Sequence, residues 1–234
     1  MKKSILVILV ALAASNLFAQ GKHEMHAFYF FNVSNPAGFV AAIDKFAASD
    51  CGKRTPADIG LMAETINGSA ASTHFVIASF EEVGDFTEMG ALMQSCADAA
   101  TMFQEMRAAA EPVSEYSVIP AIEVGDWTAD SFFMKYDLNV SDAGVYARAW
   151  TEFMEAGVAD GTIKNSYGLN RVFLGNSEAT HFVYIGASDF EALVAQDASM
   201  NSSTAATTFF RKVGGARELL NTSLIAPVKS WPKQ

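Results

Sequence analysis

The sequence predicts an α+β fold in which one β-α-β-β-α-β unit occurs twice in tandem. The first observation is a gap-free repeat at an offset of 107 residues: Asn32-Val33-Ser34 returns as Asn139-Val140-Ser141, and Thr73-His74-Phe75-Val76 returns as Thr180-His181-Phe182-Val183. A period of this length is too large for a solenoid unit and indicates two copies of a compact domain. The second observation is that strand and helix patterns follow in the same order in both copies.

Residues 1–19 have the pattern of a cleaved signal peptide. Two lysines precede an apolar stretch at 5–14, and Leu17-Phe18-Ala19 suits a cleavage site. The apolar stretch is shorter than the roughly 20 residues of a membrane span, and a retained N-terminal anchor is the alternative. We therefore expect an exported, periplasmic or extracellular protein with no membrane span after cleavage.

The overall charge argues against nucleic-acid partners. Without residues 1–19, which contain two lysines and no acidic residue, the formal charge is −12. An acidic surface without a dense Lys/Arg cluster repels phosphate backbones. Half of the residues are hydrophobic and the 18 Phe are spread along the chain, which favours a packed core.

Each copy begins with an aromatic-rich strand, at 26–31 and at 132–138. Ser34 and Ser141 then stand where the N-cap of a helix is expected. Bulky apolar residues at i, i+4 and i+7 predict that helix in both copies: Phe39, Ile43 and Phe46, and then Tyr146, Trp150 and Phe153.

The rest of each copy predicts a hairpin, a second helical region broken in two, and a last strand. The paired strands are expected at 60–67 and 73–80, and at 167–174 and 180–186, with glycine-containing turns between them. The last strands are expected at 116–124 and 221–228, and a short linker at 125–129 joins the copies. The two domains are thus predicted at 24–127 and 131–231.

This order is the ferredoxin-like arrangement, a four-stranded antiparallel sheet with helices on one face. The other face is apolar and must be covered, which two copies in one chain can do for each other. On this element order and duplication, the chain resembles the dimeric α/β-barrel superfamily in a tandem-fused, single-chain form. The resemblance covers nearly the whole mature chain and matches no catalytic motif of a particular branch.

The resemblance implies a pseudo-dimeric α/β barrel that is complete in one chain, with a higher oligomer also open. Members of the superfamily include cofactor-free monooxygenases, polyketide cyclases, haem-handling enzymes and stress-response proteins without a known reaction. It therefore leaves open whether this chain is an enzyme, and it assigns no cofactor.

The two cysteines, Cys51 and Cys96, both lie in the first copy. In an oxidising compartment, two cysteines indicate one disulfide. Two free buried thiols are the alternative. Because the second copy has no cysteine, the disulfide is interpreted as structural reinforcement.

Alternation along the first strand of each copy predicts which side chains face the barrel interior. In the first copy the inward set contains Phe28 and Phe30, and in the second it contains Lys135, Asp137 and Asn139. An asymmetric, partly aromatic cavity would suit a small apolar or amphipathic molecule. The alternative is that Lys135 and Asp137 are solvated at an open rim.

His74 and His181 are the candidate catalytic residues, because they occupy equivalent positions in apolar strands. A neutral imidazole there could act as acid, base or ligand. The alternative is a shared structural constraint at the start of the strand. Glu64 and Arg171 are also equivalent and are expected to form an ion pair between the copies.

No metal site is predicted from ligand spacing, since the chain has four histidines and no Cys/His cluster. One alternative depends on cleavage after Gln20. The mature chain would then begin Gly21-Lys22-His23, whose amine, amides and imidazole can bind Cu²⁺ or Ni²⁺ in a square plane, with His26 nearby.

Three functions remain open. The first is an exported small-molecule-binding protein with its ligand between the two sheets. The second is an enzyme of the same superfamily, similar to a cofactor-independent monooxygenase or cyclase, with His74 or His181 as acid–base. The third is a non-catalytic interaction module.

Overall fold

The computed structural model describes residues 21–175 and 178–234, so the predicted signal peptide lies outside the described residues. These ranges contain eight strands, six α-helices and two short 3₁₀ helices. The first repeat comprises β1 (Met25–Val33), α1 (Pro36–Ala48), η1 (Gly52–Arg54), β2 (Asp58–Ile66), β3 (His74–Phe80), α2 (Val83–Ser95), α3 (Ala97–Ala109) and β4 (Ala110–Val124). After η2 (Trp127–Ala129), the second comprises β5 (Phe132–Val140), α4 (Ala143–Ala159), β6 (Tyr167–Leu174), β7 (His181–Ala187), α5 (Phe190–Ser202), α6 (Thr204–Val213) and β8 (Arg217–Trp231).

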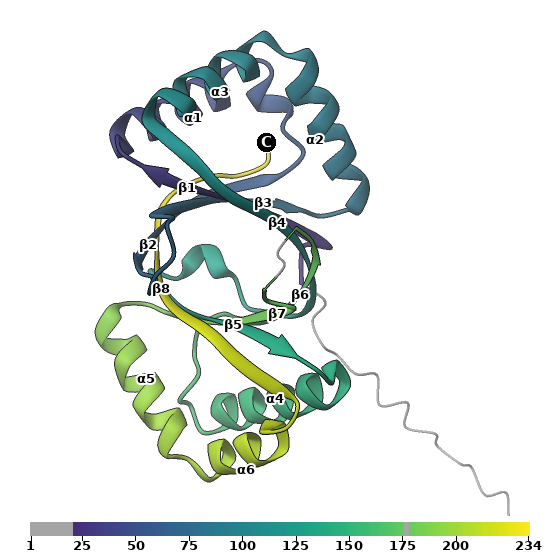
Figure 1. The fold of residues 1–234 in the computed structure, drawn as a ribbon, viewed down its shortest axis with the longest axis vertical. Coiled ribbons are helices and arrows are strands. Elements are labelled where there is room, and N and C mark those ends of the chain that lie inside the picture. Colours follow the sequence, from purple (N-terminus) through teal and green to yellow (C-terminus); the bar gives the residue numbers. More distant parts are fainter. Residues whose placement is uncertain (1–20, 176–177) are drawn as a thin grey trace, which may run out of the picture.

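The eight strands form one closed antiparallel barrel in the order β1-β3-β2-β8-β5-β7-β6-β4. Each repeat contributes four neighbouring strands in the ferredoxin-like order. Figure 1 shows the barrel in the middle of the molecule, with the helices of the first repeat at one end and those of the second at the other. The predicted pseudo-dimeric α/β barrel is therefore confirmed.

The long strands β4 and β8 join the two repeats. The first part of β4 pairs with β1 and its last part pairs with β6, while β8 pairs first with β5 and then with β2. Both strands begin earlier than predicted, at Ala110 and Arg217, because their first halves complete the sheet of their own repeat. Because β4 and β8 each pair with strands of both repeats, the barrel closes without a free sheet edge.

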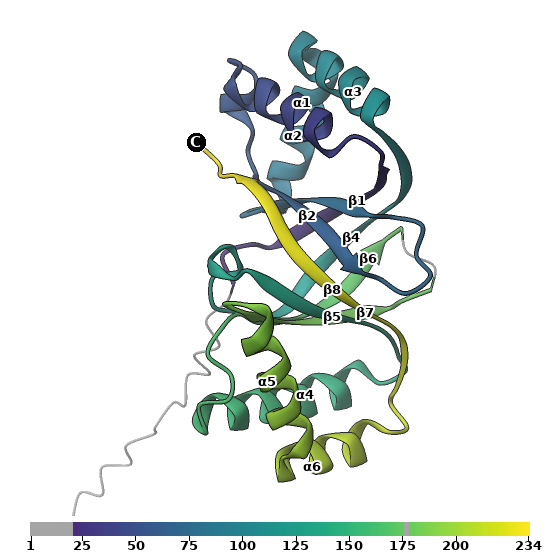
Figure 2. The ribbon, with the colours of Figure 1, turned by 90° about the vertical axis from the view of Figure 1, so that its left-hand side faces the viewer.

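The helices cover the outer face of the barrel, α1 to α3 over the first sheet and α4 to α6 over the second (Figure 2). The periodic apolar residues predicted for the first helix of each repeat are all buried against the sheet. In the second repeat, the rings of Phe153 and Phe209 stack at 4.9 Å and tie α4 to α6. No helix in the described ranges is long and apolar enough to cross a membrane.

The predicted N-caps are wrong by one residue. Asn35 and Asp142 cap α1 and α4, accepting hydrogen bonds from the amides of Gly38 and Val145. The hydroxyls of Ser34 and Ser141 instead donate to backbone carbonyls near the ends of α3 and α6. The repeated serine therefore links a strand end to a distant helix end, and the neighbouring polar residue begins the helix.

The repeated Thr-His pair has a structural role in both copies. The Thr73 hydroxyl accepts a hydrogen bond from the Val33 amide, and Thr180 does the same for Val140. The Nδ1 atoms of His74 and His181 lie 2.9 and 3.0 Å from the hydroxyl of the preceding threonine. Each pair thus satisfies a backbone amide where the first strand of the repeat ends.

The predicted disulfide is present. Cys51, just before η1, is bonded to Cys96, which caps the start of α3, with an S–S distance of 2.03 Å. It closes a loop with a sequence separation of 45 residues and belongs to the helix-side core of the first repeat. The bond connects two helical segments that the barrel strands do not hold together directly.

Removing this disulfide by Cys51→Ala with Cys96→Ala is expected to lower the free energy of unfolding by about 3 to 4 kcal/mol, because the unfolded chain loses a loop constraint. Guanidinium denaturation of the wild type with and without reductant provides the comparison. The control is Val158→Ala, which changes the exposed equivalent of Cys51 and should have little effect. Equal stability of the double variant and the oxidised wild type would contradict the role.

Candidate functional site

The middle of the barrel is filled by aromatic side chains. Phe28 and Phe30 point inward as predicted, and the ring of Phe28 lies 5.2 Å from that of Tyr116 and 5.5 Å from that of Phe182. These residues leave a cavity of only about 60 Å³ in the central part of the barrel. The central interior is therefore a packed core, and the polar chemistry lies at its two ends.

A larger cavity of about 570 Å³ opens at the end of the barrel where the β2–β3 and β6–β7 hairpins turn. We call it the mouth cavity. It is lined by Phe30, Glu64, Ser69, Ala70, Ser72, Ser114, Glu115, Tyr116, Lys135, Asp137, Gly175, Glu178, Ala179, Leu220 and Asn221. Its volume lies within the usual range for a small-molecule site.

Charges are unbalanced in the mouth cavity. Lys135 is buried and forms an ion pair with Asp137, and its ammonium lies 5.0 Å from the centre of the Phe182 ring. It is the one basic residue of the lining, against four acidic residues. Burial raises the pKa of Glu64, and a hydrogen bond from Ser72 offsets this only in part.

Two polar atoms of the mouth cavity are buried without a hydrogen-bond partner: the Tyr116 hydroxyl and Glu64 Oε2. Burial, followed by the charges of Asp137 and Glu64, raises the pKa of Tyr116 well above its usual value, so the phenol remains a donor. Unpaired buried polar groups cost free energy. A bound molecule that pairs with both atoms would remove that cost.

The other predicted ligand residue, Asn139, is exposed and lines no cavity in the described part of the chain. Its neighbours Leu138 and Val140 lie in the helix-side core, so Asn139 keeps the inward phase of the alternation, but it lies one residue beyond the last pair between β5 and β7. The lysine and the aspartate therefore lie at the cavity, and the asparagine lies beyond it.

His74 and His181 alternate with the inward-facing Phe75 and Phe182, which places them on the helix side of their strands. Burial lowers the pKa of both imidazoles, so both are neutral near pH 7. Neither lines a cavity formed by the described residues. Their catalytic role stays a prediction, without a substrate space beside either ring.

Glu64 and Arg171 form no ion pair with each other among the residues that the structure describes. The expected pairing is wrong because the two strands join different neighbours. Glu64 of β2 lies opposite Ile225 of β8, whereas Arg171 of β6 lies opposite Ile119 of β4 and is exposed.

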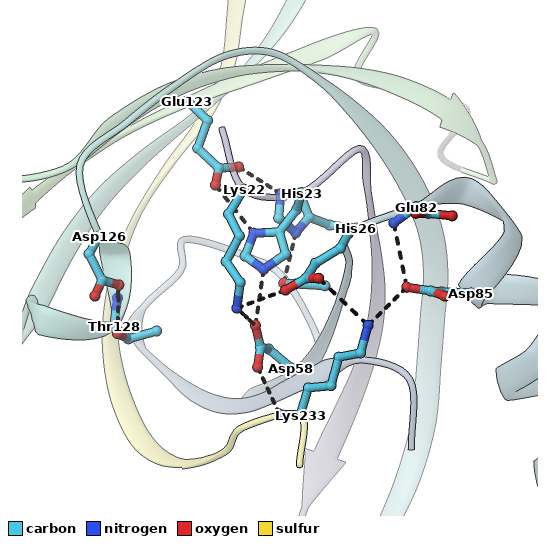
Figure 3. A network of polar contacts seen from close by, with 12 residues as sticks. Lys22, His23, His26, Asp58, Glu82, Asp85, Glu123, Asp126, Thr128 and Lys233 are labelled. Atoms are coloured by element: carbon cyan, nitrogen blue, oxygen red, sulfur yellow. Dashed lines mark hydrogen bonds and ion pairs between the residues drawn. The ribbon is translucent and has the colours of Figure 1, made fainter. Parts of the chain in front are cut away.

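The opposite end of the barrel contains a buried polar cluster of His23, His26 and Glu123 (Figure 3). Nδ1 of His23 lies 3.3 Å from Oε1 of Glu123, and Nε2 of His26 lies 3.0 Å from Oε2. On the far sides of the rings, His23 Nε2 is 3.1 Å from Asp58 and His26 Nδ1 is 2.8 Å from Ser79. One ligand atom from each of the first three residues fits within a span of 4.8 Å.

Electrostatics keep the carboxylates of this cluster ionised. Burial alone would raise the pKa of Glu123, but hydrogen bonds from His23 and His26 outweigh it and lower the pKa to about 2. Burial opposes the charged form of His23, but hydrogen bonds to Glu123 and Asp58 raise its pKa overall. Without a bound ion, the cluster is thus a buried imidazole–carboxylate network.

Sequence reasoning did not predict this cluster. The sequence indicated His23 only as a ligand beside a free N-terminal amine, with His26 nearby, and the spacing of three between the two histidines was the available signal. Glu123 lies about 100 residues further on, and β4 brings it to the start of β1 only in the folded barrel.

A third cavity, of about 320 Å³, lies outside the barrel between the second sheet and its helices. It contains none of the predicted site residues. Its lining is mainly aromatic and aliphatic, with a few polar residues: Met134, Tyr136, Tyr146, Trp150, Phe153, Val183, Ile185, Leu193, Gln196, Asp197, Met200, Asn201, Phe209, Phe210, Arg217 and Leu219.

No protein-family model and no curated protein matches the sequence. Solved structures do match over nearly the full chain. A candidate monooxygenase from Lactobacillus acidophilus has a TM-score of 0.59 at 10% identity, and the match covers 90% of this chain and 97% of that one. An anthrone oxidase-like protein has a TM-score of 0.59 at 9% identity, covering 92% and 94%. A mutant chlorite dismutase from Candidatus Nitrospira defluvii has a TM-score of 0.55 at 9% identity, covering 89% and 93%.

These similarities establish the fold, which is that of the dimeric α/β-barrel proteins with both ferredoxin-like repeats in one chain. Each match covers at least 89% of this chain, so the likeness includes both of its repeats. The names of these similar proteins indicate different chemical reactions. One fold can carry many functions, so the function depends on the residues of the site itself.

Glu64→Gln is expected to stabilise the protein at pH 8 and to have no such effect at or below pH 4. The raised pKa of Glu64 means that folding disfavours its ionised form. This cost begins as the pH rises past the unfolded value of about 4.5 and is complete above the folded pKa. Guanidinium denaturation at the two pH values measures the difference.

The matched control is Glu115→Gln, which removes an exposed carboxylate from the same cavity and should change stability less. A Glu64→Gln variant that is destabilised at pH 8 would contradict the assignment of Glu64 as a carboxylate buried at a cost.

Proposed function

We propose that this protein binds a small amphipathic molecule in the mouth cavity, through hydrogen-bond donor and acceptor groups that meet Glu64 and Tyr116. The observation that supports this most directly is the pair of buried, unpartnered atoms, Tyr116 Oη and Glu64 Oε2, in one cavity of about 570 Å³. A ligand bearing an acceptor and a donor would satisfy both.

The cavity also supports an apolar part of the ligand. Phe30 and Tyr116 continue the aromatic core of the barrel up to its floor, and Leu220 adds an aliphatic contact. An aromatic or alicyclic ring would therefore rest on the aromatic floor while its polar group reaches the carboxylate. The rest of the lining is mainly polar, so the apolar part of the ligand would contact chiefly this floor and Leu220.

Charge selects the class of ligand. Lys135 is already paired with Asp137, so the acidic residues leave the cavity with a negative excess. The overall acidic charge of the chain acts in the same direction. We infer that the ligand is neutral or cationic and that anions of the same shape bind more weakly.

The duplication supports a single site in each chain. Lys135 and Asp137 occupy the repeat positions of Phe28 and Phe30. The second repeat thus supplies the charged wall of the interior, and the first supplies the aromatic wall. The barrel has no second equivalent of this arrangement among the described residues, which favours one ligand per chain.

An enzyme remains the alternative proposal, supported by the names of similar proteins and by the shared fold. The lining of the mouth cavity contains no histidine and no cysteine. We therefore favour binding over acid–base catalysis by an imidazole. An interaction module has less support, since the barrel offers no free sheet edge within the described ranges.

We further propose that binding takes place after export. The leader pattern at 1–19 and the disulfide both suit an oxidising compartment. One pseudo-dimer per chain makes the functional unit a monomer, with a higher oligomer as the open alternative.

Fluorescence titration can test the site with two probes of similar shape. N-phenylnaphthylamine, a neutral aromatic amine, is expected to bind saturably at one site per chain. Anilinonaphthalene sulfonate, its anionic counterpart, is expected to bind at least about tenfold more weakly because of the acidic lining.

Variants locate the probe in the cavity. Ser114→Trp places a large ring in the cavity lining and should reduce affinity for N-phenylnaphthylamine at least about tenfold. The control is Val113→Trp, at an exposed neighbour that lines no cavity in the described chain. Equal loss in both tryptophan variants, or tighter binding of the sulfonate, would refute the proposal.

A further inference from the structure

We propose that His23, His26 and Glu123 form a binding site for a divalent transition metal, with Zn²⁺ as the best match, at the end of the barrel opposite the mouth cavity. All three residues are buried, and their ligand atoms lie within 4.8 Å of one another. Two imidazole nitrogens and a carboxylate are a ligand set that Zn²⁺ commonly takes, whereas Mg²⁺ and Ca²⁺ prefer oxygen ligands alone.

The spacing of the donor atoms suits tetrahedral coordination. Metal–nitrogen and metal–oxygen bonds of about 2.0 to 2.1 Å separate neighbouring ligands by roughly 3.4 Å in a tetrahedron. The two imidazole-to-carboxylate distances are 3.3 and 3.0 Å. Each oxygen of Glu123 faces a different histidine, so one ion between the three side chains would need only small movements of the rings.

The hydrogen bonds of His23 support the same site. Both ring nitrogens of His23 face carboxylate oxygens, Nδ1 that of Glu123 and Nε2 that of Asp58. A neutral imidazole has a proton on only one nitrogen, so one of these contacts would lack its hydrogen. Two species resolve this conflict: an imidazolium, or a metal ion on Nδ1 with a proton kept on Nε2.

The surroundings orient the ligands as they do in known metal sites. Metal-binding histidines usually donate the other ring N–H to a carboxylate or another acceptor, which fixes the ring. Asp58 occupies that position for His23, and the Ser79 hydroxyl occupies it for His26. Asp58 is itself held by the Lys22 ammonium at 2.7 Å and the Lys233 amide at 2.8 Å (Figure 3).

Charge and space are also compatible with an ion. The Lys22 ammonium already pairs with Asp58, whereas Glu123 faces only the two imidazoles, so a cation at this site would meet a carboxylate that no lysine or arginine of the described residues neutralises. His26 also lines the central cavity of about 60 Å³, which has room for about two waters. Asn170 Oδ1, buried in the wall of that cavity, has no hydrogen-bond partner and could hold such a water. The site would therefore keep a coordination position for water.

The experiment is a Zn²⁺ titration of the full mature chain by calorimetry after treatment with a chelator, followed by Co²⁺ absorption spectroscopy. One Zn²⁺ per chain is expected, and Co²⁺ should show the intense visible bands of four-coordinate cobalt. Cu²⁺ and Ni²⁺ are poor probes here because a free N-terminal amine followed by histidine can bind them without the fold.

The four histidines provide matched variants. His23→Gln and Glu123→Gln should each weaken Zn²⁺ binding by more than about 100-fold, and Asp58→Asn by about 10- to 100-fold. His74→Gln and His181→Gln, which change imidazoles outside the cluster, should leave the affinity within about twofold. Circular dichroism of each variant separates loss of the site from loss of the fold.

Substoichiometric Zn²⁺ binding by the wild type would overturn the proposal, and the imidazolium–carboxylate network would then be the resting state of the cluster. Equal loss of affinity in His23→Gln and His74→Gln would overturn it as well. If every cluster variant unfolds, the Co²⁺ spectrum of the wild type still tests the proposal, because a spectrum without the bands of four-coordinate cobalt would contradict it. This site lies apart from the mouth cavity, so the result is independent of the ligand-binding proposal.

Discussion

A single ferredoxin-like repeat would expose two sheet edges and one apolar face. The far halves of β4 and β8 pair with the edge strands β6 and β2, and the two apolar faces then cover each other. Each strand first completes its own sheet and then pairs with the other repeat. This main-chain pairing closes the barrel, so that the aromatic residues of both sheets share one interior core. Because the barrel is closed, its two ends are separate chemical environments, and the aromatic core lies between them.

Divergence between the repeats has made each end of the barrel asymmetric. Phe28 and Phe30 correspond to Lys135 and Asp137, and His26 corresponds to Phe133. Each repeat thus contributes a polar group where the other contributes an aromatic ring. A homodimer of identical repeats could not do this, since every substitution would occur twice. Fusion into one chain permits a charged wall and an aromatic wall within the mouth cavity, and a histidine at the other end where the second repeat has phenylalanine.

Both ends hold polar groups that a purely structural core would avoid. The mouth cavity contains Tyr116 Oη and Glu64 Oε2 without partners, and burial raises the pKa of Glu64. At the other end, His23 lies between two carboxylates that it cannot satisfy together as a neutral ring. Such local costs are common at functional sites. By contrast, the repeated threonines have a structural role that both copies share, since Thr73 and Thr180 accept hydrogen bonds from the amides of Val33 and Val140.

The sequence by itself determined the duplication, the order of the elements, the disulfide partners and the inward face of the first strands, because these follow from periodicity within short segments and from counting cysteines. It correctly placed Phe28, Phe30, Lys135 and Asp137 in the barrel, but it also placed Asn139 there, which lies beyond the last pair of β5 with β7, because alternation does not show where the pairing of two strands ends. Only the tertiary structure decided that Glu64 and Tyr116 meet at the mouth and that Glu123 reaches His23 and His26. Those meetings arise from pairing between strands that lie far apart in the chain, and local pattern contains no information about such pairing.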